Sequence, residues 1–180
     1  MIRDLFKKFS AMKELVGDVI AEIKFSRGNF SEGVEILKSY RSMKLICAAT
    51  SNEKLLVKFI TPSHEIKAAI GTRIQSDKKT WRIFTSAEVT NFVNEVGDSN
   101  EIHKFNPPIV PGFLILEEIL NHENFSSCNA LNLKFKHFIT AGEPLTLICA
   151  EDKSEIISAG EVKVVIRKIV GDEKIAIIRE

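Results

Sequence analysis

The hydrophobic positions in the first sixteen residues recur with the period of an α-helix. Apolar residues stand at 2, 5, 6, 9, 12, 15 and 16, and most of the residues between them are charged. This spacing places the apolar side chains on one face of a helix. We therefore expect an amphipathic helix over residues 2–16.

Short runs rich in Val and Ile follow this helix, and Gly, Ser or Asn separates them. Such runs are typical of β-strands joined by turns. The expected strands are 19–25, 33–40, 43–50, 54–60 and 65–74.

The segment 84–97 is expected to form a second helix. Thr85 or Ser86 is suited to be its N-cap, and Glu88 stands three residues after Thr85, where it completes a capping box. Gly97 is suited to end the helix because glycine readily adopts the left-handed conformation found after a last helical turn.

A third helix is expected over residues 112–121, after a proline at position 111, a residue type common in a first helical turn. Four consecutive apolar residues, 113–116, point to every side of its first turn. A helix that is apolar on every side must be wrapped by other structure. Further strands are expected at 130–138, 144–151, 161–170 and 174–180.

The connections between these later strands are too short for crossovers, so the sheet is expected to be antiparallel. The pattern predicts an α+β fold in which a sheet curls around a buried helix. A generic α+β layer fits the same pattern. The segments 43–59 and 146–162 share Leu-Ile-Cys-Ala, which either reflects common strand composition or marks two related halves.

Composition and charge indicate a folded protein and argue against some classes of binding partner. A chain of 180 residues with 44% apolar and 27% charged residues is expected to bury a core, as one domain or as two small halves. The net charge of +1 predicts neither nucleic-acid binding nor binding to an anionic membrane. The amino terminus lacks a signal-peptide core and no apolar run reaches membrane-spanning length, so we expect a cytoplasmic protein.

Three widely spaced cysteines without a CxxC pair are expected to be small buried residues in a reducing compartment. The sequence also contains no HExxH motif, and no histidine has partners at metal-ligand spacing. We therefore expect no metal site.

Asp98, Asn100 and His103 lie between the second and third expected helices. On a continuous helix, Asp98 and His103 would be about 140° apart and could not act on one substrate. The polar residues after Gly97 favour a turn instead, which would bring the three side chains together at the start of the helix at Gly112. Taken alone, this spacing is equally compatible with a turn-capping aspartate and an ordinary loop histidine.

Three segments in order carry a more specific resemblance. They are FTSAEVTNFVNEVGDSNEIH (84–103), PIVPGFLILEEIL (108–120) and LNLKFKHFITAGEPLTL (131–147). Together they resemble the MaoC-like, (R)-specific enoyl-CoA hydratase family over about residues 82–150. The resemblance implies a hot-dog fold, an antiparallel sheet wrapped around a central helix, or a degenerate double hot dog. Residues 81–180 would be the catalytic half, and residues 1–80 a degenerate hot-dog-like or β-rich half.

The resemblance also implies roles for individual residues. Asp98 and His103 would handle water, Asn100 would support them, and the Gly112 N–H would bind the thioester oxygen. An acid and a base are what addition of water across a 2-enoyl thioester requires, and an N–H at a helix N-terminus stabilises the developing oxyanion. The implied substrates are trans-2-enoyl or (R)-3-hydroxyacyl thioesters of coenzyme A or an acyl carrier protein, with no separate cofactor.

The sequence departs from the family pattern in three places. Glu101 replaces a proline, Pro111 replaces a histidine, and only eight residues (104–111) separate His103 from Gly112. This segment is too short and too rich in proline for the helix that covers substrate in typical members. Two alternatives remain: a hot-dog thioesterase that activates water with Asp98 or Glu101, and a non-catalytic protein that binds acyl thioesters.

Lys134 and Lys136 alternate with apolar residues in the expected strand 130–138. They are candidates to bind the phosphates of coenzyme A or of an acyl-carrier prosthetic group. An ordinary solvated strand face would show the same pattern. A catalytic half alone would expose a sheet edge and an apolar face, so pairing is expected within the chain, between protomers or both, and a homodimer is the expected assembly.

Overall fold

The computed structural model describes residues 2–63 and 79–169. The strands expected at 65–74 and 174–180 lie outside the described residues. The helices are α1 (Ile2–Ser10), α2 (Ser86–Val96) and α3 (Gly112–Asn121), with short 3-10 helices η1 (Lys13–Leu15) and η2 (Glu101–Lys104). The strands are β1 (Val19–Arg27), β2 (Gly33–Tyr40), β3 (Met43–Ala49), β4 (Glu53–Ile60), β5 (Ala130–Phe135), β6 (Thr146–Ile148), β7 (Ser154–Ser158) and β8 (Glu161–Lys168).

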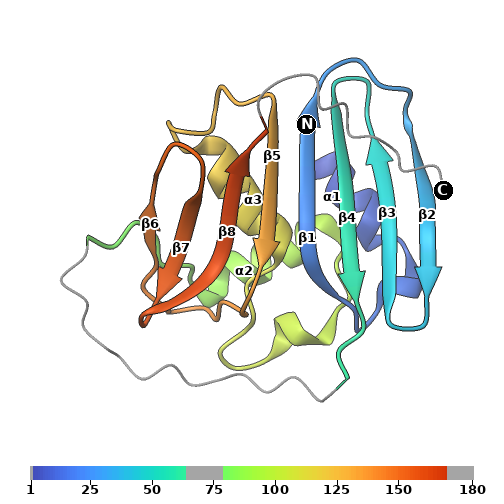
Figure 1. The fold of residues 1–180 in the computed structure, drawn as a ribbon. Helices are drawn as coiled ribbons and strands as arrows, with labels where there is room; N and C mark the ends of the chain where they lie inside the picture. Colours follow the sequence, from blue (N-terminus) through green and yellow to red (C-terminus); the bar gives the residue numbers. More distant parts are fainter. Residues whose placement is uncertain (1, 64–78, 170–180) are drawn as a thin grey trace.

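The strands form one sheet in the order β2-β3-β4-β1-β5-β8-β7-β6, and every neighbouring pair is antiparallel. The three helices lie together on one side of this sheet (Figure 1). The predicted antiparallel sheet is thus confirmed.

The same order of elements occurs twice along the chain. A helix followed by four strands gives the sheet order β1-β4-β3-β2 after α1 and β5-β8-β7-β6 after α3, and β1 pairs with β5 at the centre. The Leu-Ile-Cys-Ala match pairs a segment of β3 with one that starts in β6. These strands occupy different positions in the two sets, so the short sequence match does not follow the repeated order. The division into two hot-dog-like halves stays a prediction.

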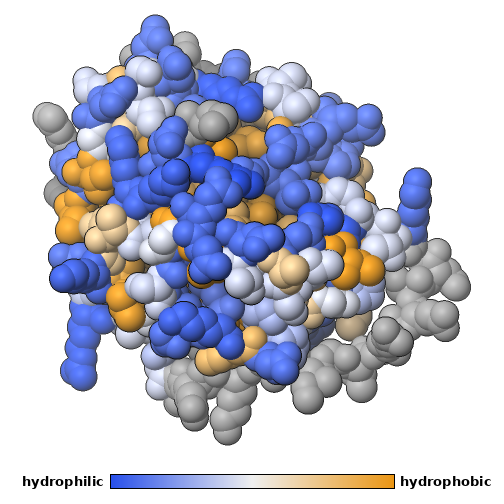
Figure 2. Space-filling view, turned by 180° about the vertical axis from the view of Figure 1, so that it is seen from behind, coloured by the Kyte–Doolittle hydropathy of each residue, from blue (hydrophilic) through white to orange (hydrophobic). Residues whose placement is uncertain are grey.

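The core lies between the sheet and the helices. Six residues of α3 are buried, including all four of 113–116, as expected for a helix wrapped on every side. Phe6 of α1 stacks on Phe113 of α3, with ring centroids 4.7 Å apart. The outer surface on the helix side is mainly hydrophilic, with smaller hydrophobic patches between the polar side chains (Figure 2).

Two helices differ in how closely they follow the sequence patterns. The helix α2 begins after Thr85 with a complete capping box and ends at Gly97, whose φ is +72°, as predicted. The helix expected over 2–16 stops at Ser10. Met12 has an extended backbone (φ −87°, ψ 105°) and separates α1 from η1. The regular spacing of apolar residues over 2–16 therefore spans two short helices with a break between them.

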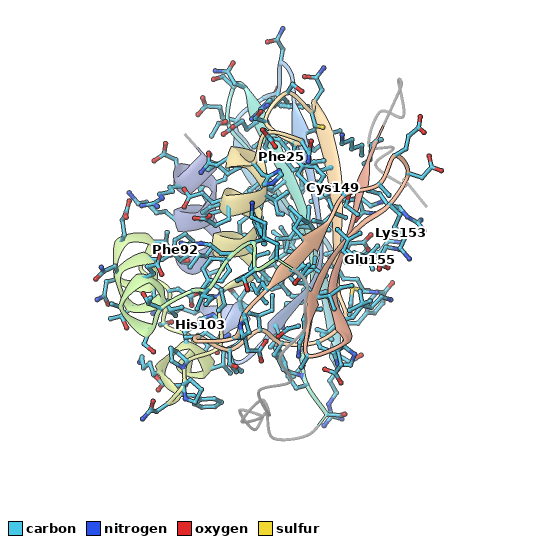
Figure 3. The ribbon with its side chains drawn as sticks, turned by 90° about the vertical axis from the view of Figure 1, so that its left-hand side faces the viewer. Phe25, Phe92, His103, Cys149, Lys153 and Glu155 are labelled. Carbon is cyan, nitrogen blue, oxygen red and sulfur yellow. The ribbon has the colours of Figure 1, made fainter. Side chains whose placement is uncertain are left out.

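Strand β7 was not predicted. It is joined to β8 by a two-residue turn at Ala159 and Gly160, both with positive φ. Hairpin turns of this kind usually carry Asn-Gly or Asp-Gly, and the sequence Ala-Gly lacks that signal. The expectation that all cysteines are buried is also wrong: Cys47 is buried, Cys128 is half-buried, and Cys149 is exposed directly after the edge strand β6 (Figure 3).

Candidate active site

The segment after α2 forms a tight turn. The Asn100 N–H donates to Asp98 Oδ1 (2.9 Å), and the Ile102 N–H donates to Asn100 Oδ1 (3.5 Å) at the start of η2. Asp98 therefore has the turn-capping role that its spacing allowed. The turn also reverses the chain, so that Asp98 and His103 do not lie on one continuous helix.

This reversal brings Asp98 and His103 together. Asp98 Oδ2 lies 3.5 Å from His103 Nε2, and the two side chains are 20% and 7% exposed. His103 lies on the helix side of the sheet (Figure 3). Asp98 thus uses one carboxylate oxygen in the turn and presents the other to the imidazole.

The other ring nitrogen of His103 determines its tautomer. Nδ1 lies 2.7 Å from the carbonyl oxygen of Ile109. Because a carbonyl oxygen only accepts hydrogen bonds, the proton is on Nδ1 and a neutral imidazole has its lone pair on Nε2. Burial lowers the pKa of His103 below its ordinary value, although the nearby Asp98 charge acts in the opposite direction. The imidazole is therefore neutral at neutral pH, with Nε2 available as a base.

The segment 104–111 holds the Ile109 carbonyl in place. The Ile109 N–H donates to Ile102 O (3.2 Å), and the Val110 N–H donates to Ile139 O (2.8 Å). The segment contains a cis peptide bond between Asn106 and Pro107. Beyond Lys104, the last residue of η2, it forms no helix, as predicted from its length and prolines.

Gly112 is the first residue of α3, and Pro111 is its N-cap rather than part of the first turn. The first N–H of α3 to bond backward is that of Ile115, to Pro111 O (3.2 Å), so the N–H groups of residues 112–114 have no intrahelical acceptor. A Cβ at Gly112 would lie 3.2 Å from Ile20 Cδ1 and 3.3 Å from Phe135 Cζ. Close packing against β1 and β5 is thus one reason for glycine here.

A cavity of about 270 Å³ joins these groups. Asp98, Asn100, His103 and Gly112 all line it, together with residues from both halves of the chain. Its apolar lining includes Phe9, Met12, Leu15, Ile20, Phe59, Phe113, Phe135 and Ile139. The four residues singled out in the sequence therefore meet at one apolar cavity.

The charged candidates around the site are placed differently. Lys136 lines the cavity, whereas the Lys134 side chain is half exposed and its Nζ lies 3.7 Å from Glu22 Oε1. The Glu101 side chain is 71% exposed and pairs with Lys104 at 2.6 Å. Glu101 is not among the residues that line the cavity.

Asp18 also lines the cavity, and the sequence patterns did not indicate it. It is 6% exposed and precedes β1. An aspartate after a glycine at the start of a strand is the ordinary pattern of a turn, so no local signal distinguishes it. Over residues 2–63 and 79–169, no group of three or more His, Cys, Asp or Glu side chains is arranged to hold a metal ion. No helix in these parts of the chain is long and apolar enough to cross a membrane.

No protein-family model matches the sequence, and no curated protein does so. Solved structures do match the fold. HtdX from Mycobacterium tuberculosis superposes with a TM-score of 0.60 at 12% identity, covering 93% of this chain and 87% of that protein. The peroxisomal multifunctional enzyme type 2 from Drosophila melanogaster gives a TM-score of 0.57 at 10% identity, over 94% of this chain and 40% of that protein.

A MaoC-like dehydratase from Phytophthora capsici gives a TM-score of 0.50 at 11% identity, over 88% of this chain and 70% of that protein. At these identities the likeness concerns the fold. The chain has the hot-dog fold, and the resemblance to MaoC-like proteins is confirmed at that level.

Proposed function

We propose that this hot-dog protein adds water to trans-2-enoyl thioesters, or removes it from (R)-3-hydroxyacyl thioesters, at the cavity beside His103. The observation that carries the proposal is the convergence of three groups on one apolar cavity: the Asp98 carboxylate, the neutral His103 imidazole and the N-terminus of α3 at Gly112. The fold shared with a MaoC-like dehydratase supports it.

The Asp98–His103 pair would manage the proton transfers. Asp98 Oδ2 and His103 Nε2 are 3.5 Å apart, so both atoms can contact the oxygen of one water molecule. As this oxygen bonds to C3 of the enoyl group, the pair accepts a proton from the water, and it delivers a proton to C2. The pair ends in the protonation state in which it began, and the net change is addition of water.

The helix α3 would stabilise the charge that develops on the thioester oxygen. The Gly112 N–H is the candidate donor, and the N-terminal end of the helix dipole adds a favourable potential. The apolar walls of the cavity would receive the acyl chain. The carrier is coenzyme A or an acyl carrier protein, and Lys136 at the cavity is a candidate contact for its phosphate.

The test is loss of the conjugated enoyl absorbance when purified protein is mixed with trans-2-enoyl thioesters of several lengths on both carriers. Asp98→Asn and His103→Ala should each lower kcat by about 10²- to 10⁴-fold, the range for loss of an acid–base group. Glu101→Gln is the matched control, because its carboxylate is exposed and does not line the cavity; it should leave kcat unchanged.

Three outcomes would contradict the proposal. Undiminished hydration in both variants would refute the site. Release of free thiol without hydration would indicate a thioesterase. Neither reaction, with every chain length and both carriers, would indicate a protein that only binds acyl thioesters.

A further inference from the structure

The mechanism above leaves one buried carboxylate at the cavity unused. Both oxygens of Asp18 have partners: Lys44 Nζ donates to Oδ2 (2.6 Å) and Thr61 Oγ1 donates to Oδ1 (2.6 Å). The Asp18 side chain is 4% exposed and that of Lys44 is 18% exposed. The N-terminal half of the chain thus contributes a nearly buried ion pair beside the candidate site.

A β-bulge directs this end of β1 toward the cavity. Ile20 pairs with Phe59 and Ile23 pairs with Val57, and the register shifts between Ile20 and Glu22. Phe59 and Val57 are both buried, so Ile20 and Ile23 share the helix side although they are three residues apart. Residues at this spacing in a regular strand point to opposite faces. The extra residue in the bulge is what lets Ile20 and Ile23 lie on the same side of the sheet. Asp18 lines the cavity together with Ile20.

Asp18 is joined directly to the turn that carries the acid–base pair. Asn100 Nδ2 donates to the main-chain oxygen of Asp18 (2.8 Å), a buried bond across 82 residues of sequence. The N–H of the same Asn100 donates to Asp98 Oδ1 (2.9 Å). A continuous series of contacts therefore runs from Lys44 through Asp18 and Asn100 to Asp98.

We propose that Asp18, held by Lys44 and Thr61, is a positioning residue that fixes the Asp98–His103 turn through Asn100. The N-terminal half then acts on the site by orienting its acid–base pair. As a statement about catalysis, this inference rests on the proposed function.

The location of Lys44 supports a positioning role over simple stabilisation. Lys44 pairs with Phe59 on the helix side of β3, the side on which Ile46 and Ala48 are fully buried. Apolar residues of similar volume usually stabilise a protein as well as a buried ion pair does. An ion pair, unlike apolar side chains, fixes the Asp18 backbone in one orientation by directional hydrogen bonds.

The test measures the His103 ring by NMR in the absence of substrate. Lys44→Met removes the ion pair, and loosening of the turn should admit water to the imidazole. Because burial is what lowers the pKa of His103, the titration midpoint should then move upward toward its ordinary value. Lys44→Arg keeps the ion pair and should restore the wild-type titration. In an Asn100→Ala background, Lys44→Met should have no further effect, since the connection to Asp98 is already lost.

Arg3→Met is the matched control. Arg3 forms a bidentate pair with Glu117 (2.7 and 2.8 Å) that also joins the two halves, but neither residue lines the cavity. This variant should lose stability and keep the wild-type His103 titration. If Lys44→Met does not fold, Thr61→Val removes the hydrogen bond that an uncharged hydroxyl donates to Asp18 and should move the titration in the same direction by less.

The inference is overturned if the folded Lys44→Met or Thr61→Val protein titrates as wild type, or if the Lys44→Met effect persists in full with Asn100→Ala. In an active enzyme, Lys44→Met should lower kcat by about 10- to 100-fold with little change in KM, the effect of a misplaced catalytic group. An inactive wild type with the expected titrations would refute only the proposed function. Activity with an unmoved titration would refute only the inference.

Discussion

At the scale of single residues, the state of His103 depends on a main-chain carbonyl and on burial. The Ile109 carbonyl holds the proton on Nδ1, and burial lowers the pKa of the ring. Neither effect can be inferred from the spacing of Asp98, Asn100 and His103, because the Ile109 carbonyl lies outside this motif and burial of the ring depends on the folded chain. The resemblance to MaoC-like proteins singled out the chemical groups, and the surroundings of His103 determine its protonation.

The lowered pKa of His103 predicts a pH dependence of stability. The unfolded chain takes up a proton near the ordinary pKa of 6.5, whereas the folded protein does so only at lower pH. The contribution is therefore complete above pH 6.5 and is lost as pH falls toward the folded-state pKa, with a slope of at most about 1.4 kcal/mol per pH unit. His103→Gln should reduce this slope when urea unfolding is measured between pH 7.5 and 5.

The wild-type protein, measured over the same pH range, is the reference for this slope. An equal slope in His103→Gln and the wild type would mean that His103 is not the group responsible.

At the scale of elements, α2 was predicted almost to the residue, whereas α1 and β7 were not. The ends of α2 are determined by residues next to them in sequence. Thr85 and Glu88 form the capping box at the start, and Gly97 adopts the left-handed conformation at the end. The end of α1 has no comparable local signal, and apolar residues continue beyond it to pack on the core from η1. A hydrophobic period therefore shows most of the residues that pack on the core, although Val16 is 58% exposed, but not whether the helix is continuous.

The capping box provides a prediction for α2. Thr85→Ala removes the hydroxyl that accepts from the Glu88 N–H (3.2 Å) and should lower the free energy of unfolding by about 1 kcal/mol, measured by urea denaturation. Thr90→Ala is the matched control in the same helix. Thr90 is exposed and its hydroxyl donates to Ser86 O (2.9 Å) within the helix, so alanine should be neutral or slightly stabilising. Equal losses in the two variants would contradict the capping role.

At the scale of the whole molecule, both sets of strands share one sheet and one core. Strands β1 and β5 pair over five residue positions. A single cluster of buried residues includes Ile46 and Val57 from the first set and Ile156 and Val164 from the second. This continuity implies that the described structure unfolds as one unit, although its strand order occurs twice.

The shared core predicts a long-range effect of Ile46→Ala. Ile46 is fully buried in β3, so the substitution should cost about 2–5 kcal/mol. Trp81 is the single tryptophan, and its main-chain N–H donates to the main-chain oxygen of Leu145. This contact lies near β6, at the other end of the sheet from β3. Tryptophan fluorescence and far-UV circular dichroism should therefore shift to the same lower urea midpoint.

Ile83→Ala is the control, because Ile83 is 45% exposed; it should change stability by less than about 0.5 kcal/mol. A tryptophan transition that stays in place while part of the circular dichroism signal shifts would show that the two sets of strands unfold separately.

Local patterns in the chain predicted α2, α3, most strands and an antiparallel sheet around a buried helix, because periodicity and capping depend on residues within a few positions of one another. The hot-dog fold and the choice of Asp98, Asn100, His103 and Gly112 as candidates came from the resemblance to MaoC-like proteins over residues 82–150. The order of the strands, the bulge in β1 and the contact between Asn100 and Asp18 depend on segments far apart along the chain. Such pairings are chosen by packing of the folded core, which no local pattern encodes.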